Sequence, residues 1–273
     1  MTTVVFWKVK SPLSLDMKVG GINVIADSRV SNGSSVLTNN CAKIFEVPVH
    51  CQITDDEVTF QDRVDHYTNI VVGISGSTLI AQNTVFCLQQ TLCRLVGTEM
   101  PSIVDIATFA ASVLTNLSKE VGIITPKTAY SEIVIVGMNG NETQAYSIRP
   151  NDEGPLEYYY TKIDAFPYAM GSGARVFNRE YDKVNLDEIS DNSLEQLPIR
   201  IFDEHLIQSE NDPHTGGELQ MLTISGEGVS RFIPMRWSEA EFNYKRELFG
   251  QNILEKAIGN SRIASSTWIL DDC

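Results

Sequence analysis

The chain has 273 residues and a mass of 30.3 kDa, with 42% hydrophobic and 21% charged residues, so it can bury a sizeable core. This composition excludes collagen-like, disordered and disulfide-scaffold classes. The formal net charge of −14 opposes binding to phosphate backbones and anionic membranes, so neither a nucleic acid nor a membrane partner is expected.

The N-terminal part predicts three strands that meet at one end. Residues 1–10 and 21–26 are rich in β-branched and apolar side chains, which favours an antiparallel hairpin. Because the two strands of a hairpin run in opposite directions, Asp27, after the second strand, is expected beside the N-terminus. Residues 41–53 predict a third strand that begins near the same end. This strand brings Lys43 to the same place.

A strand and two helices are predicted next. Residues 69–77 favour a buried strand that closes on a turn at Gly76. Apolar side chains then recur every three or four residues around residues 83–97 and 102–118, which predicts two amphipathic helices.

The C-terminal half is predicted to be mostly β-structure. Strand-like sequence lies at residues 132–140, 145–150, 157–173 and 216–234. A tight turn is expected at Asn139-Gly140. Residues 193–209 have helical spacing with a break or late start at Pro198, and residues 238–257 predict a charged helix capped by Ser238.

The element order predicts one α+β domain over residues 1–273. No repeat, low-complexity run or linker interrupts it. Strands that are apolar on both faces need cover on both sides, which favours two sheets between helix layers, a four-layer αββα sandwich.

The cysteines and histidines indicate neither a metal site nor a disulfide framework. The five cysteines are an odd number without a CxxC pair, and the four histidines are scattered. We therefore expect no cofactor. Reduced cysteines, together with the lack of a signal-peptide pattern or a membrane-length apolar run, predict a cytoplasmic protein.

The N-terminus carries a possible nucleophile. Removal of Met1, which is readily achieved when the next side chain is small, would expose the α-amino group of Thr2. An N-terminal threonine combines a nucleophilic hydroxyl with its own base, because the α-amino group has a reference pKa of about 7.7 to 8.0. On its own, Thr2 is more simply the residue at which translation begins.

Short motifs along nearly the whole chain strengthen the interpretation of Thr2 as a nucleophile. In chain order they are the N-terminal TT with VVFWKV, then VIADSRVS, AKIFEV, GISGS, AMGSG and DPHTGG. This series resembles the proteasome β-subunit family, including its bacterial HslV-type relatives. No propeptide is expected ahead of Thr2, a feature in which the chain resembles those bacterial relatives.

The resemblance implies the site residues and the fold. An N-terminal nucleophile hydrolase of the αββα type is expected, without a metal. The catalytic residues implied are Thr2, Asp27, Lys43, Ser172, Asp212 and Thr215, with an oxyanion-hole amide at Gly76. The substrate-binding positions implied are Val30, Ser31, Cys41, Phe45, Ile74 and Thr78, a mostly apolar set.

These roles are chemically consistent with one another. Lys43 would lower the proton affinity of the Thr2 amine and hydroxyl, and Asp27 would pair with Lys43. Ser172, Asp212 and Thr215 would hydrogen-bond around the α-amino group. Each residue also has a plainer interpretation: a surface ion pair for Asp27 and Lys43, a turn residue for Ser172, and a helix-end cap for Asp212.

The expected function is therefore a threonine-type peptidase that acts on peptides or unfolded proteins inside a homo-oligomeric ring. Two alternatives share the resemblance: a non-catalytic structural subunit of proteasome-like fold and a small-molecule amidase. The sequence leaves open the cleavage specificity, the ring size, the removal of Met1 and any ATPase partner.

Overall fold

Two β-sheets lie at the centre of the structure. The computed structural model describes residues 2–9, 20–32, 35–53, 64–124, 130–151, 156–186, 191–208, 214–226, 228–238, 243–248, 251–252, 257–258, 261–262 and 266–269. The strands of the first sheet are, in spatial order, β11 (Tyr168–Gly171), β1 (Thr3–Val9), β2 (Gly21–Ala26), β12 (Gln220–Ser225), β13 (Gly228–Ser238), β14 (Asn243–Leu248) and β15 (Gln251–Asn252), with β18 (Ser266–Ile269) also beside β13. The second sheet contains β10 (Tyr158–Lys162), β9 (Glu142–Pro150), β8 (Ser131–Asn139), β6 (Val64–Gly76), β5 (Ile44–Ile53) and β7 (Leu95–Gly97). Two further strand pairs join β3 (Val30–Asn32) to β4 (Ser35–Thr38) and β16 (Ala257–Ile258) to β17 (Ser261–Arg262).

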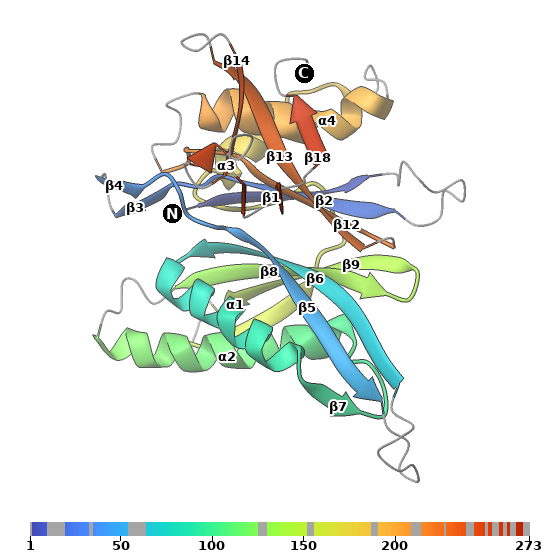
Figure 1. Ribbon diagram of the computed structural model, residues 1–273. Coiled ribbons are helices and arrows are strands. Elements are labelled where there is room, and N and C mark those ends of the chain that lie inside the picture. The colour runs from blue at the N-terminus through green and yellow to red at the C-terminus, as the bar shows by residue number, and fades with distance from the viewer. Residues whose placement is uncertain are drawn as a thin grey trace.

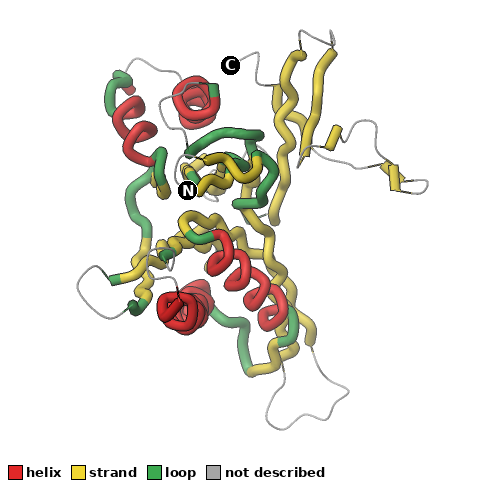
Figure 2. The backbone as a smooth tube through the Cα atoms, turned by 90° about the vertical axis from the view of Figure 1, so that its left-hand side faces the viewer, coloured by secondary structure: helices red, strands yellow, loops and turns green. Residues whose placement is uncertain are grey.

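Helices cover the outer side of each sheet. The helices of the described residues are α1 (Thr78–Leu92), α2 (Ile103–Ile124), α3 (Ala174–Tyr181) and α4 (Asp191–Phe202), which continues into the π-helical turn η3 (Asp203–Ile207). Figures 1 and 2 show α1 and α2 on one side of the strands and α3 and α4 on the other. The structure is therefore of mixed α and β type. No helix in these described ranges is long and apolar enough to cross a membrane.

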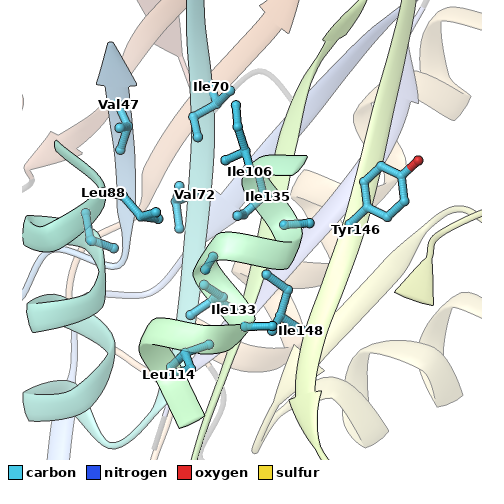
Figure 3. Packing of buried hydrophobic residues seen from close by; sticks show 14 of the residues in the cluster. Val47, Ile70, Val72, Leu88, Ile106, Leu114, Ile133, Ile135, Tyr146 and Ile148 are labelled. Atoms are coloured by element: carbon cyan, nitrogen blue, oxygen red, sulfur yellow. The ribbon is translucent and has the colours of Figure 1, made fainter. Parts of the chain in front are cut away.

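Three hydrophobic clusters hold the layers together. The side chains of β6 alternate: Ile70 and Val72 pack toward α1 and α2, whereas Val71 points to the space between the sheets. Figure 3 shows the first of these clusters, in which Leu88 of α1 and Leu114 of α2 meet the strands. Burial of one such side chain stabilises the fold by about 1.5 to 3 kcal/mol, so the clusters fix how the sheets and helices stack.

Several predicted elements are confirmed. The N-terminal hairpin is present, with Val4 opposite Ala26, and the third strand starts at Ile44, directly after Lys43. The tight turn joins β8 to β9, with Asn139 opposite Glu142 and Gly140 at a φ of +58°.

The predicted bounds of the first helix are wrong, and the strand-like sequence at residues 157–173 divides between the two sheets. The first helix begins at Thr78 and ends at Leu92, and residues 95–97 instead form β7, in parallel pairing with β5. Residues 157–173 form strands of both sheets, since β10 pairs with β9 and β11 pairs with β1. An apolar pattern marks a strand, but it does not encode the strand's partner.

Two predictions for the last third are also wrong. Pro198 lies inside α4 without ending it, because buried Leu197 and Ile199 pack against the first sheet and offset the lost backbone hydrogen bond. Part of the segment predicted as a helix, Asn243–Leu248, instead forms β14, which pairs with β13. The backbone hydrogen bonds at the edge of β13 outweigh the weak helix propensity of these residues. Parts of that segment lie outside the described residues.

Candidate active site

Thr2 lies buried directly before β1, at one end of this strand of the first sheet. Its side chain is 2% exposed, and its carbonyl oxygen accepts a hydrogen bond of 3.0 Å from the backbone amide of Ser172. The adjacent Gly171 has a φ of +89°, and a Cβ there would collide with the Thr2 carbonyl oxygen. Glycine is therefore required for β11 to approach Thr2 this closely.

Lys43 reaches Thr2 from the other sheet. It lies just before β5, its side chain is 1% exposed, and its Nζ donates hydrogen bonds to the Oγ1 atom of Thr2 and, at 3.0 Å, to the carbonyl oxygen of Arg29. Burial lowers the pKa of the Lys43 amine, while the charge of Asp27 and the Cys41 thiol act in the opposite direction. The Lys43 amine is thus a weaker base than that of a surface lysine, and its ammonium form donates a hydrogen bond directly to the Thr2 hydroxyl.

Asp27 lies fully buried at the end of β2. Its carboxylate accepts hydrogen bonds from the backbone amides of Thr3 at 2.9 Å, Arg29 at 3.1 Å and Gly216 at 3.2 Å. Burial raises its pKa to about 6, although Lys43 and these three amides lower it. The described contacts of the carboxylate are to backbone amides and not to the Lys43 ammonium, which differs from the expected direct pair.

The two hydroxyl residues of the later motifs also lie beside the N-terminal strand. The hydroxyl of Thr215 is 2.6 Å from that of Thr3, which also accepts a hydrogen bond of 2.8 Å from the amide of Gly173. Ser172 directly follows β11. Asp212 lies outside the described residues, so its expected place at the α-amino group stays a prediction.

Gly76 lies at the end of β6 in a backbone conformation that favours glycine. Its φ is +85°, and a Cβ at this position would lie 2.6 Å from the carbonyl oxygen of Tyr130. The next amide, that of Ser77, donates to the same carbonyl oxygen at 2.7 Å. The turn before α1 is thereby held against the start of β8.

The expected substrate-binding positions fall into two groups. Ser31 is half-buried in β3, with its hydroxyl 3.0 Å from Nδ1 of His214, and Val30 precedes it. The second group surrounds the start of α1, where the Cys41 thiol accepts a hydrogen bond of 3.3 Å from the Gln82 side chain. The other members of this group are Phe45 and Ile74 of the cluster under α1, with Ile74 only 1% exposed, and Thr78, the first residue of α1.

Two further residues contribute to the site without being predicted from the sequence. The sequence places Thr3 in the N-terminal TT motif and the first strand without a role in the site, although its hydroxyl lies 2.6 Å from that of Thr215. Gln220 is 4% exposed and binds the backbone of Lys43 through its side chain. The one signal in the sequence is a polar side chain at the first position of a largely apolar strand. Within the described residues, no group of histidine, cysteine or carboxylate side chains could hold a metal ion.

The comparisons with known proteins relate the fold to the proteasome. No protein-family model matches the sequence, and no curated protein sequence matches it significantly. Among solved structures, the chain is similar to Anbu (ancestral beta-subunit) from Yersinia bercovieri, with a TM-score of 0.55 and 14% sequence identity over 84% of this chain and 87% of that chain. The chain therefore has a proteasome-like fold.

Proposed function

We propose that the protein is an N-terminal nucleophile hydrolase that cleaves peptide or related amide bonds, with Thr2 as the nucleophile after removal of Met1. The observation that carries the proposal is the hydrogen bond from the Lys43 ammonium to the Thr2 hydroxyl in a buried site beside Asp27. A buried ammonium is costly unless it is hydrogen-bonded and lies near an opposite charge, and a cation at a hydroxyl favours the alkoxide that attacks a carbonyl. The whole chain would act as one such domain of αββα type.

The proposed reaction has two steps. The Oγ1 atom of Thr2 bonds to the substrate carbonyl carbon while its proton passes to the α-amino group, and the backbone amide of Gly76 stabilises the oxyanion. The C–N bond then breaks, and the departing amine takes the proton. Water hydrolyses the resulting ester at Thr2, releasing the acid and restoring the hydroxyl.

The surrounding residues have supporting roles in this proposal. Asp27 supplies negative charge near Lys43, and Ser172 and Thr215 orient the N-terminal strand and its amine. Asp212, which lies outside the described residues, would have the same role as Ser172 and Thr215. Val30, Ser31, Cys41, Phe45, Ile74 and Thr78 would contact the substrate. A homo-oligomeric ring in the cytoplasm would keep the site away from folded proteins.

Covalent labelling tests the proposal directly. A β-lactone or epoxyketone probe should add its mass at Thr2 of chains that have lost Met1, as intact-mass and peptide mass spectrometry can show. Thr2→Ala should neither label nor turn over peptide substrates, whereas Thr2→Ser should keep some activity because it keeps both groups. Chains that retain Met1 should be as inactive as Thr2→Ala.

The outcomes also separate the alternatives. Labelling at a cysteine, or full peptidase activity in Thr2→Ala, would contradict the mechanism. Processed chains that never label would favour the non-catalytic subunit. Labelling at Thr2 without cleavage of any peptide would favour an amidase for small molecules.

A further inference from the structure

Gln220 joins the two sheets at the candidate active site. It is the first residue of β12 and pairs with Ala26, the residue before Asp27. Lys43, in contrast, lies on the segment that leads into β5 of the other sheet. The position of the Lys43 ammonium relative to Thr2 therefore depends on contacts that cross from one sheet to the other.

The side-chain amide of Gln220 makes three hydrogen bonds, two of which reach across to the segment that leads into β5. Its Oε1 atom accepts the backbone N–H of Lys43 at 2.9 Å. Its Nε2 group donates to the carbonyl oxygen of Cys41 at 2.7 Å and to that of Asp27 at 3.2 Å. Both N–H donors and the carbonyl acceptor are thus used, which defines the orientation of the amide.

Other hydrogen bonds hold the same segment in part. The Cys41 amide donates to the Ser28 carbonyl oxygen, and the Lys43 carbonyl oxygen accepts from the Ile74 amide, both at 2.9 Å. The N–H of Lys43 and the carbonyl of Cys41 depend on Gln220 in the described part of the chain. Replacement by an apolar side chain would leave the buried N–H of Lys43 and the part-buried carbonyl of Cys41 without this partner, so the segment is expected to move.

We propose that Gln220 is a positioning residue that sets the Lys43 ammonium against the Thr2 hydroxyl. Its importance for turnover rests on the function proposed above, but its effect on Lys43 does not. A carboxylate at the same place would still accept from Lys43, but it would face the carbonyl oxygens of Cys41 and Asp27 without a proton to donate. The amide therefore matters for its donors as well as its shape.

The test uses Gln220→Met, Gln220→Glu and a matched control, Gln208→Met. Gln208 also has a hydrogen-bonded side chain, but its partner is Asp203 in η3. Amide hydrogen exchange at Lys43 and ¹⁵N NMR titration of its Nζ report the position of Lys43 in any folded chain. In Gln220→Met, we expect about tenfold faster exchange at Lys43 and a changed Nζ pKa, with neither effect in Gln208→Met.

Turnover and its pH profile provide the second measurement. Gln220→Met should lower kcat by about tenfold while KM stays within about twofold, because the altered contact acts on the nucleophile and not on substrate binding. The activity of Gln220→Glu relative to the unmodified chain should rise as the pH falls, since a protonated Glu regains a donor. In Gln220→Glu, the exchange rate of the Lys43 amide relative to the unmodified chain should likewise fall back as the pH falls. This measurement tests the proposal even if Gln220→Met does not fold.

The outcomes keep the two proposals apart. Unchanged exchange and Nζ titration in folded Gln220→Met, or in Gln220→Glu at high pH, would overturn the positioning role. If the unmodified chain never labels at Thr2, the proposed hydrolase function fails, and the NMR measurements still decide whether Gln220 positions Lys43.

Discussion

At the residue scale, the site is a buried pair of opposite charges that do not touch. Asp27 is held by three backbone amides, and Lys43 is held by Thr2 and by the Arg29 carbonyl. Burial raises the pKa of Asp27 to about 6 and lowers the pKa of Lys43. Both groups are therefore converted to their neutral forms more easily than the same groups in water. The charge of each group opposes the shift of the other, and pKa values shifted by burial are common at functional sites.

Replacing the lysine tests its chemical role. Lys43→Ala should lower turnover or probe labelling by at least about 100-fold, because the cation at the Thr2 hydroxyl is lost. The pKa of Asp27 should rise further, since Lys43 holds it down. Lys119→Ala removes an exposed lysine paired with Glu157 and should change neither property. Equal activity in Lys43→Ala would exclude Lys43 from the mechanism.

The raised pKa of Asp27 predicts a pH dependence of stability. Between the unfolded pKa of 3.8 and the folded value of about 6, the folded state binds more protons than the unfolded state. The free energy of unfolding should therefore fall as the pH rises through this window, by about 3 kcal/mol for Asp27 alone. Asp27→Asn lacks this contribution.

Urea denaturation of both chains from pH 4 to pH 7 measures the effect. The difference in unfolding free energy between Asp27→Asn and the unmodified chain should shift in favour of the variant as the pH rises. Parallel curves would show that Asp27 titrates normally.

At the element scale, the close pairing of β11 with β1 depends on a glycine. Gly171 adopts a φ of +89° and leaves no room for a side chain beside Thr2. Its partner on β1 is Thr3, whose hydroxyl is tied to Thr215 and Gly173. The first residue of β1 is thus held by β11 on one side and by Thr215 on the other. A nucleophile at this end of the strand requires such a fixed position.

A glycine-to-alanine comparison tests this arrangement. Gly171→Ala should destabilise the fold by about 3 kcal/mol, because backbone strain and overlap with Thr2 add together. Gly140→Ala is the matched control: its φ is also positive, at +58°, but nothing lies within 4 Å of the new Cβ. It should cost only about 1 kcal/mol. Equal shifts in the urea midpoint would mean that the Thr2 contact contributes nothing.

At the scale of the whole molecule, α1 presents an uncharged face to solvent. Leu79 and Phe86 of this helix are 63% and 59% exposed, and the helix contains no charged residue. Copies of a chain with a net charge of −14 repel one another, so an uncharged apolar face is where two copies can approach most easily. This supports the expected homo-oligomer.

Light scattering tests this assembly. The unmodified chain should have a mass well above the 30.3 kDa of one copy, and a Leu79→Glu/Phe86→Glu double variant should dissociate at micromolar concentration. Tyr67→Glu changes an exposed residue at the far end of β6 and should leave the mass unchanged. A monomeric unmodified chain would contradict the expectation.

The sequence by itself determined the local elements and predicted that Thr2, Asp27 and Lys43 lie close together. Runs of β-branched and apolar side chains specify β1 and β2, and the geometry of a hairpin brings Asp27 to the N-terminus without further information. The strand after Lys43 is likewise predicted from its own apolar residues. Short-range periodicity and turn chemistry are properties of neighbouring residues, so they can be read directly from the chain.

Only the tertiary structure decided how these parts combine. The helix expected at residues 238–257 gave way in part to β14, because the open edge of β13 competes with local propensity. Strands β10 and β11 joined different sheets, although they are close in the chain. Gln220 lies 177 positions from Lys43, so their hydrogen bond depends on the stacking of two sheets, which no local pattern records. Burial likewise set the pKa of Asp27, because desolvation exists only once the surrounding layers have packed.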